Sequence, residues 1–158
     1  MSGNFRVIAA LAAGVAWLAI GSTAASDSAA FSAQDVIQAR QSGFKKMGAA
    51  LKTISEQLKT DAPDLAKITA AAAAIGAGAH EQPDWFPAGS GPESGLETDA
   101  LPHIWQDTSK FAALSRQLGV ESGNFATAVA NKDVAAIRTQ FKVLAEVCSS
   151  CHKSFRAD

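Results

Sequence analysis

The sequence predicts an all-α protein, an antiparallel four-helix bundle. In four separate segments the apolar residues recur at alternating intervals of three and four, the spacing that places them on one face of an α-helix. The 158 residues include no tyrosine and many alanines, a composition that favours helix over sheet. Two short connections and one long central loop join the four segments, so successive helices can lie antiparallel around a shared core.

Residues 1–24 have the organisation of a secretory signal peptide. Arg6 supplies the positive start, residues 7–20 form a continuous apolar run, and small residues at 22–25 offer cleavage sites. The apolar run is shorter than the roughly 20 residues that a membrane-spanning helix needs, so we expect no stable membrane anchor. The prediction is cleavage between 24 and 30, export from the cytoplasm and a mature domain at 25–158.

A tight turn is expected between the first two helices. Ser32 is the expected N-cap of the first helix, with Asp35 three residues on. A turn at 60–63 follows, and Pro63 suits the first position of the second helix. Gly43 and Gly48 lie inside the first helix, where a glycine allows another helix or a flat ring to approach closely. The expected core residues are Ile37, Phe44, Met47, Leu51, Ile54 and Leu58, then Leu65, Ile68, Ala72, Ile75 and Ala79.

A long loop is expected from residue 80 to about 99, because proline and glycine replace the helical periodicity there. Trp85 and Phe86 are the only large apolar residues in its first part. We therefore expect them to fold inward as an anchor or to line the edge of a cofactor. His80, at the start of the loop, and His103, at the start of the next helix, are interpreted as surface residues.

The third and fourth helices complete the bundle. The third is expected to begin near residues 101–102 and to end at a polar connection, residues 131–133. Its apolar face comprises Ile104, Phe111, Leu114, Leu118, Phe125 and Val129. In the fourth helix the alternation runs without a break through Val134, Ile137, Phe141, Leu144, Cys148, Cys151 and Phe155. The two cysteines therefore occupy core positions, and whatever they hold is expected inside the bundle.

Cys148, Cys151 and His152 form the attachment signature of a c-type haem, Cys-x-x-Cys-His. The two thiols add across the vinyl groups of the porphyrin and become thioethers. On a helix the three residues lie at i, i+3 and i+4, so they project from one face, and the histidine can reach the iron as an axial ligand. The sequence therefore predicts one haem c per chain, attached covalently through Cys148 and Cys151 and ligated by His152.

Other uses of a Cys-x-x-Cys pair fit this sequence less well. A thioredoxin-like dithiol follows a strand and stands at a helix N-terminus, whereas these cysteines lie near the C-terminal end of a helical pattern. A zinc site takes about four ligands, but the chain has two cysteines, and His80 and His103 are isolated. A formal net charge of −1 without a dense basic cluster gives no support to a nucleic-acid partner.

Over essentially its whole mature length the chain resembles the class II c-type cytochromes of the cytochrome c′ type. The matching stretches are residues 39–44, 85–90, 101–105 with Phe111, and 148–152 followed by Phe155 and Arg156. The resemblance implies a four-helix bundle in the bacterial periplasm that binds NO and CO, discriminates against O₂ and exchanges electrons with an unidentified periplasmic redox partner. By the same analogy we expect a homodimer formed through the first two helices.

The sixth coordination position of the iron decides which function the resemblance implies. In low-spin relatives a methionine of the first helix fills it, and the matching position, four residues after Arg40, is Phe44. A phenyl ring offers no lone pair, so the resemblance implies a five-coordinate, high-spin iron that faces an apolar distal side. The alternative is a six-coordinate, low-spin electron-transfer cytochrome with Met47, one helical turn further along the same face, as second axial ligand.

Four more residues match family positions near the haem. Arg40 is expected to pair with a haem propionate, its alternative being a plain surface charge. Gln41 and Ser90 are expected at the haem periphery. Arg156 lies four residues after His152, so it is expected over the proximal face, where it would tune the imidazole.

Two compatible functions follow: a haem protein that sequesters or senses NO, and an electron carrier that cycles between Fe(III) and Fe(II). A haem enzyme, such as a weak peroxidase or an NO reductase, is not expected. Catalysis of that kind needs a distal acid–base pair, and the apolar face of the first helix offers Phe44 and Met47 instead of histidine or glutamate.

Overall fold

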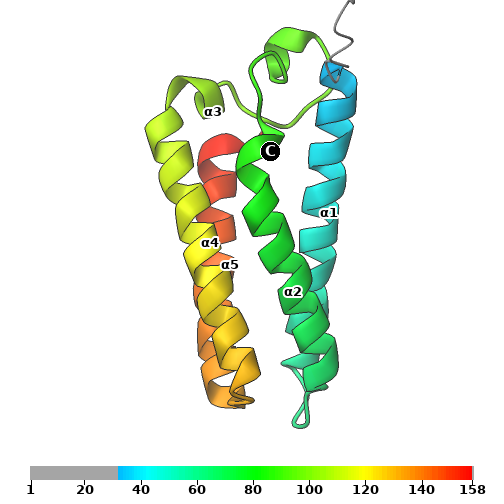
Figure 1. The fold of residues 1–158 in the computed structure, drawn as a ribbon, viewed down its shortest axis with the longest axis vertical. Helices are drawn as coiled ribbons and strands as arrows, with labels where there is room; N and C mark the ends of the chain where they lie inside the picture. Colours follow the sequence, from blue (N-terminus) through cyan, green and yellow to red (C-terminus); the bar gives the residue numbers. More distant parts are fainter. Residues whose placement is uncertain (1–31, 158) are drawn as a thin grey trace, which may run out of the picture. The chain divides into compact units, whose positions relative to one another are not determined.

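The structure is a computed structural model that describes residues 32–157, so the predicted signal peptide at 1–24 lies outside the described residues. Four long helices make up most of the described chain: α1 (Ala33–Gln57), α2 (Leu65–Glu81), α4 (Thr108–Ala130) and α5 (Val134–Phe155). α1 packs on α2, α2 on α4 and α4 on α5, and successive helices run in opposite directions (Figure 1). The predicted antiparallel four-helix bundle is confirmed.

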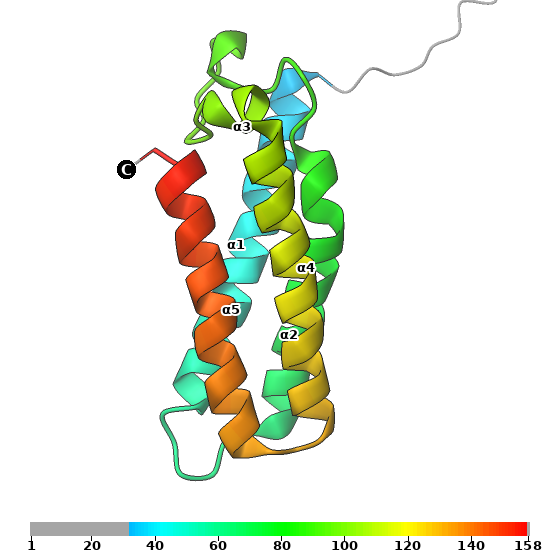
Figure 2. The ribbon, with the colours of Figure 1, turned by 90° about the vertical axis from the view of Figure 1, so that its left-hand side faces the viewer.

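Three short elements cross one end of the bundle between α2 and α4. They are the 3₁₀ turns η1 (Gln82–Trp85) and η2 (Pro92–Ser94) and the one-turn helix α3 (His103–Gln106). Figures 1 and 2 show them at the end where α1 begins and α5 finishes. The loop starts slightly later in the chain than predicted, because α2 continues through His80 to Glu81. His80 and His103 are both exposed, as expected.

The predicted third helix is interrupted at Asp107, where the sequence pattern indicated a continuous helix. Asp107 has φ −112° and ψ 64°, and its carboxylate accepts a hydrogen bond from the backbone N–H of Lys110 at 3.2 Å. This is an N-cap, which satisfies one of the free donors at the start of α4. The chain turns there, so α3 and α4 are separate helices.

The other long helices also begin at capping side chains. Ser32 caps α1 as predicted, accepting from the N–H of Asp35 at 3.2 Å. Asp64 caps α2 and Asp133 caps α5, each accepting from two backbone N–H groups of the first turn. Pro63 therefore lies before the cap of α2 and not at the first helical position, because the Asp64 carboxylate supplies the cap.

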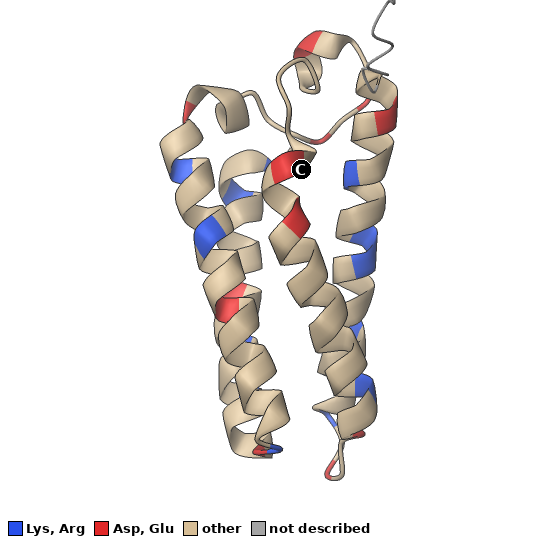
Figure 3. Cartoon of the chain, viewed as in Figure 1, with Lys and Arg blue, Asp and Glu red and all other residues tan. Residues whose placement is uncertain are grey.

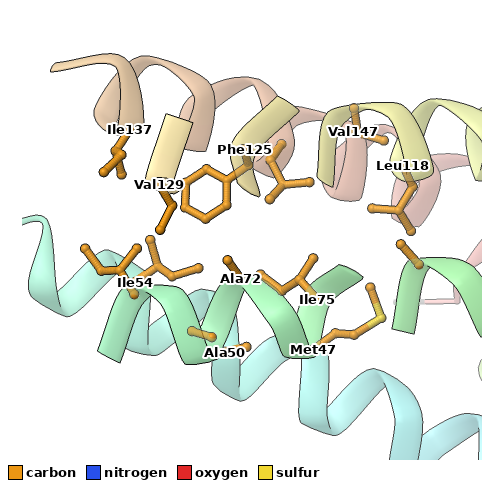
Figure 4. Close-up of a cluster of buried hydrophobic side chains, with 14 of the residues drawn as sticks. Met47, Ala50, Ile54, Ala72, Ile75, Leu118, Phe125, Val129, Ile137 and Val147 are labelled. Atoms are coloured by element: carbon orange, nitrogen blue, oxygen red, sulfur yellow. The ribbon is translucent and has the colours of Figure 1, made fainter. Parts of the chain in front are cut away.

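The apolar faces of the four long helices meet in one large buried cluster, part of which Figure 4 shows. Ile54, Phe125 and Leu144 are completely shielded from solvent. Full burial of one such side chain contributes about 1.5–3 kcal/mol to stability. Val147 is also buried, although the predicted face of the fourth helix omitted it. Some predicted core residues are only half-buried: Phe44, Leu51, Leu65, Leu114, Val134, Phe141, Cys148 and Cys151.

The surface of α1 away from this cluster is basic. Lys45, Lys46 and Lys52 are exposed there, and Figure 3 shows the basic segments along that helix. Within residues 32–157, no helix combines the length and the apolar character that crossing a membrane requires.

Both ends of α5 are tied to the rest of the bundle. Near its start, Arg138 donates hydrogen bonds to the backbone carbonyls of Leu58 and Thr60, at the end of α1. At its end, the backbone N–H of Leu101 donates to the carbonyl of Phe155 at 3.0 Å. The last turns of α5, which carry the cysteine motif, are thereby fixed beside the segment that leads into α3.

Candidate haem site

Cys148, Cys151 and His152 lie in the last two turns of α5, at the end of the bundle that the loop covers. The helix is continuous there, so the i, i+3, i+4 arrangement expected from the sequence is present. Both cysteines are half-buried. Cys148 packs against the large cluster, and Cys151 packs against a smaller second cluster around Phe111. The two sulfur atoms are thus presented to apolar surroundings.

The surroundings of the two thiols keep them protonated. Burial raises the pKa of Cys148, and burial together with the charge of an ionised Cys148 raises the pKa of Cys151 to about 11. At neutral pH both groups are thiols, which is unfavourable for dithiol exchange, since that reaction uses a thiolate. In residues 32–157, no three His, Cys, Asp or Glu side chains come together as a metal site. These observations favour thioether attachment over the two alternatives.

His152 follows on the exposed side of α5, one residue beyond Cys151. Neighbouring protein atoms still desolvate its ring enough to lower its pKa, and the positive charge of Arg156 lowers the pKa further. Both effects favour the neutral imidazole, which is the form that offers a nitrogen lone pair to a metal.

α1 faces this part of α5 across the side of the bundle that is least closely packed. The pairs α1–α2, α2–α4 and α4–α5 pack along their lengths, whereas α1 and α5 do not form a comparably close pair. The hydrogen bonds of Arg138 connect α1 and α5 at the opposite end. The α1–α5 side is therefore where the bundle can accommodate a flat group without separating a closely packed pair.

Phe44, on α1, is held by the two aromatic residues of the loop. Its ring lies edge-on to Trp85 at a centroid distance of 5.1 Å and is tilted against Phe86 at 6.2 Å. Trp85 can lie this close to α1 because Gly43 has no side chain: a Cβ atom there would collide with the indole ring. The predicted inward anchor is confirmed, and the close approach predicted at Gly43 is made by a flat ring. The close approach predicted at Gly48 is wrong, because a Cβ atom there meets nothing within 4 Å.

The aromatic contacts continue from Phe86 to the end of α5. Phe86 and Phe111 are in edge contact at 4.9 Å, and Phe111 is in edge contact with Phe155 at 5.2 Å. Phe155 lies four residues after Cys151, one turn along the same helix. Rings from α1, the loop, α4 and α5 thus form one apolar series beside the cysteine motif.

Arg40 is buried, which excludes the surface-charge alternative. The residue is 3% exposed. Nη1 donates hydrogen bonds to the carbonyl of Trp85 at 3.3 Å and to the hydroxyl of Ser90 at 3.1 Å. Nη2 donates to the carbonyl of Ser90 at 2.9 Å and to the hydroxyl of Thr98 at 2.8 Å. The guanidinium also lies over the ring of Phe86, 4.7 Å from its centroid. Nothing in the sequence indicated that Thr98 would take part, because its hydroxyl accepts a hydrogen bond from Arg40, 58 residues away.

Gln41 and Arg156 lie at the surface. Gln41 is exposed next to Arg40. Arg156 follows the last residue of α5 and forms an exposed ion pair with Asp99 at 3.5 Å. Its positive charge lowers the pKa of His152, as described above, and its predicted place over the proximal face stays a prediction.

Met47 belongs to the core between α1 and α2. It is 5% exposed, and its sulfur lies where α2 carries a glycine: a Cβ atom on Gly78 would stand 2.6 Å from the sulfur. Its thioether therefore fills the space that this glycine leaves, on the side of α1 that packs against α2.

The residues present fit a covalently attached haem. Two protonated thiols, spaced as the vinyl groups require, stand beside a neutral imidazole on one helix face. The thiols face apolar clusters that include four phenylalanine rings in series, which suits a large flat aromatic group.

Comparisons with known proteins point in the same direction. The family model described as Cytochrome C′ matches residues 35–156. A cytochrome c′ of Rhodopseudomonas palustris is 38% identical over 126 residues, which cover 78% of this chain and 82% of the relative. A cytochrome c-556 of Agrobacterium tumefaciens is 31% identical over 121 residues, which cover 76% of this chain and 95% of the relative.

Solved structures agree with these sequence relatives. The crystal structure of cytochrome c′ from Thermochromatium tepidum superposes with a TM-score of 0.74 at 25% identity, covering 80% of this chain and 98% of that chain. The chain therefore belongs to the cytochrome c′ family, whose members carry covalently attached haem c.

Proposed function

We propose that this chain is a periplasmic haem c protein with a five-coordinate, high-spin iron that binds small neutral diatomic ligands such as NO and CO, carries single electrons, or does both. In this proposal Cys148 and Cys151 hold the haem through thioethers and His152 is the axial ligand. Membership of the family supports the class of function, because cytochromes c′ are electron carriers and gas binders rather than enzymes.

The bound haem supplies an iron with one open coordination position and a reversible Fe(III)/Fe(II) couple. The protein supplies the surroundings that select its ligands. Partial desolvation and the charge of Arg156 lower the pKa of His152, which favours the neutral imidazole whose lone pair can make the proximal bond.

The observation that carries the proposal is the position of Phe44. Its ring is fixed between Trp85 and Phe86, and none of these three side chains carries a group that can ligate iron. An apolar wall of this kind solvates water and anions poorly, whereas a neutral diatomic loses little on entering. A ligand must also displace the ring, so the wall selects by size and by the strength of the bond to iron.

The rival proposal, a low-spin iron ligated by Met47, is weakened by the packing of that residue. Its sulfur fills the space at Gly78 inside the core, and withdrawing it would leave a void there. A cavity of this kind costs about 1 kcal/mol or more for each methyl-sized volume.

Arg40 is proposed to support the haem periphery mainly by holding the loop. Both terminal nitrogens are engaged by Trp85, Ser90 and Thr98, so Nε is the donor left for a propionate. Gln41, exposed beside it, offers a side-chain amide to the same region. Ser90 is proposed to border the haem while its hydroxyl donates to the carbonyl of Pro87 at 2.8 Å.

Gas binding and dimer formation both have counterparts among the solved relatives. Structures of cytochrome c′ from Alcaligenes xylosoxidans hold NO in one case and CO in another; at 22% identity they share the fold with this chain. Another cytochrome c′, 25% identical with a TM-score of 0.74, is described as having ligand-controlled dimer dissociation. We propose a homodimer here through α1 and α2, where exposed alanines at 70, 73, 74 and 77 permit close approach of a second helix pair.

Absorption and electron paramagnetic resonance spectra of the exported protein test the proposal. A high-spin ferric signal, and a ferrous Soret band that shifts when CO or NO is added, are expected. A low-spin ferrous spectrum that CO leaves unchanged would contradict the open coordination position. A colourless exported protein would contradict haem attachment itself.

A further inference from the structure

An apolar groove lies between α2 and α4, apart from the candidate haem site. Its volume is about 590 Å³, within the usual range of small-molecule sites. The end of α2, η1, α3 and the first half of α4 line it, and Cys148, Cys151, His152 and Phe44 do not. The groove is thus a separate feature of the same end of the bundle.

The walls of the groove are mostly apolar. Ala79 comes from α2, Ile104 and Trp105 come from α3, and Phe111 comes from α4. Gly119 lies further along α4, and a Cβ atom added there meets nothing within 4 Å. An alkyl chain laid along these walls would remove apolar surface from water on both sides.

One polar group inside the groove has no partner. Ser115 is only 8% exposed, and its buried hydroxyl makes no hydrogen bond to any described residue. A buried hydroxyl without a partner costs about 1–3 kcal/mol, so a ligand that accepts its hydrogen bond is favoured.

The rim of the groove is basic. Arg116, the residue after Ser115, and His80, at the end of α2, both line it and are exposed. No aspartate or glutamate lines the groove, and among the described residues no ion pair engages Arg116. The combination of apolar walls, an unpaired hydroxyl and a cationic rim is complementary to an amphipathic anion.

We propose that this groove binds a small amphipathic carboxylate with a medium-length alkyl chain. The carboxylate accepts a hydrogen bond from Arg116 at the rim and one from the Ser115 hydroxyl inside the groove, with His80 as a further donor. The alkyl chain lies against Ile104 and Phe111.

Two aromatic rings that line the groove also belong to the aromatic series beside the cysteine motif. Phe86 and Phe111 line the groove, and they also contact Phe44 and Phe155 respectively. A ligand in the groove therefore touches two rings of the aromatic series beside the cysteine motif. Binding is expected to shift the Soret band slightly, in addition to releasing or absorbing heat.

Calorimetric titration of the haem-loaded protein with octanoate tests the proposal, with 1-octanol as the uncharged counterpart. Octanoate is expected to bind saturably at one site per chain with a Kd at or below the millimolar range, and octanol about tenfold more weakly. No saturable binding up to about 10 mM octanoate, or equal binding of octanol, would overturn the proposal.

Three variants separate this groove from binding elsewhere. Arg116→Gln is expected to weaken octanoate binding about tenfold and Ser115→Ala several-fold, with little change for octanol. Gly119→Leu places a side chain in the open space of the groove, so it is expected to abolish binding of both octanoate and octanol. The change also favours the helix, because leucine has a higher helix propensity than glycine. Lys59→Gln, in the exposed turn after α1 at the other end of the bundle, is the matched charge control and is expected to bind octanoate normally. Unchanged binding in Arg116→Gln and Gly119→Leu would place the ligand elsewhere and refute the assignment.

Discussion

Arg40 and Ser90 are joined by two hydrogen bonds, from Nη1 to the serine hydroxyl at 3.1 Å and from Nη2 to the serine carbonyl at 2.9 Å. They lie 50 residues apart in the sequence and are 3% and 1% exposed. Burial lowers the pKa of Arg40, so the fold sequesters a charged group that prefers water. The loop acceptors compensate for this desolvation, and the loop is thereby fixed to α1.

We expect Arg40→Met to lower the free energy of unfolding by about 3 kcal/mol, because the buried acceptors of Trp85, Ser90 and Thr98 would lose their donor. Urea denaturation of the haem-loaded variant and of the original protein measures this difference in the free energy of unfolding. Lys45→Met, on the exposed side of the same helix, is the control and should change stability by no more than about 0.5 kcal/mol. Equal stabilities of the two variants would show that the Arg40 contacts contribute little.

Phe44→Met is expected to shift the iron towards six-coordinate low spin, because a thioether would stand where the ring now packs between Trp85 and Phe86. The absorption spectrum of the ferrous variant and its slower or weaker CO binding report the change. An unchanged high-spin spectrum would count against the placement of Phe44 at the distal face.

Met47→Leu is the matched control for this experiment. Met47 is buried against Gly78, so a leucine of similar volume is expected to leave the spin state unchanged and to cost less than about 1.5 kcal/mol in stability. A change of spin state in this variant alone would instead favour Met47 as the second axial ligand.

The fold was predictable because the decisive signals are local. Ile54, Phe125 and Ile137 occupy positions set by a repeat of three and four residues, and all three are fully buried. The interruption at Asp107 was missed, because apolar periodicity continues across it and the cap depends on one carboxylate turning back to Lys110. An aspartate followed by Thr108 and Ser109 is a recognisable start signal that the periodicity outweighed.

In the candidate site, too, residues that belong to a local motif were predictable and residues that depend on distant contacts were not. Cys148, Cys151 and His152 lie within five consecutive residues of one helix, so the motif alone predicted their arrangement on one helix face. The burial of Arg40 could not be predicted from its own helix, since its acceptors lie 45 to 58 residues away in a loop without periodicity. The groove at Ser115 likewise depends on α2 and α4 meeting, and no local pattern marks it.

His152→Ala is expected to give little haem-loaded protein, and what forms should lack the native ferrous spectrum, because the proximal bond is lost. Yield after export and the ferrous spectrum measure the effect. His103→Ala, at an exposed position of α3, should mature normally. Normal yield and a native spectrum in the His152 variant would contradict the ligand assignment.

Two glycines of α1 provide a matched test of the contact between α1 and Trp85. An alanine in the middle of a helix is ordinarily about 1 kcal/mol more stable than glycine. Gly48→Ala should show this gain, because a Cβ atom there meets nothing within 4 Å. Gly43→Ala should instead lose about 1–3 kcal/mol, because its Cβ atom would collide with the indole ring.

The same pair of variants tests whether Trp85 holds Phe44 in place. Displacing the indole ring in Gly43→Ala removes its edge contact with Phe44, so we expect faster CO binding in this variant, measured by stopped flow. Gly48→Ala should bind CO at the original rate, since it leaves both rings untouched. If Gly43→Ala matches Gly48→Ala in stability and in CO binding rate, the indole ring does not constrain the distal wall.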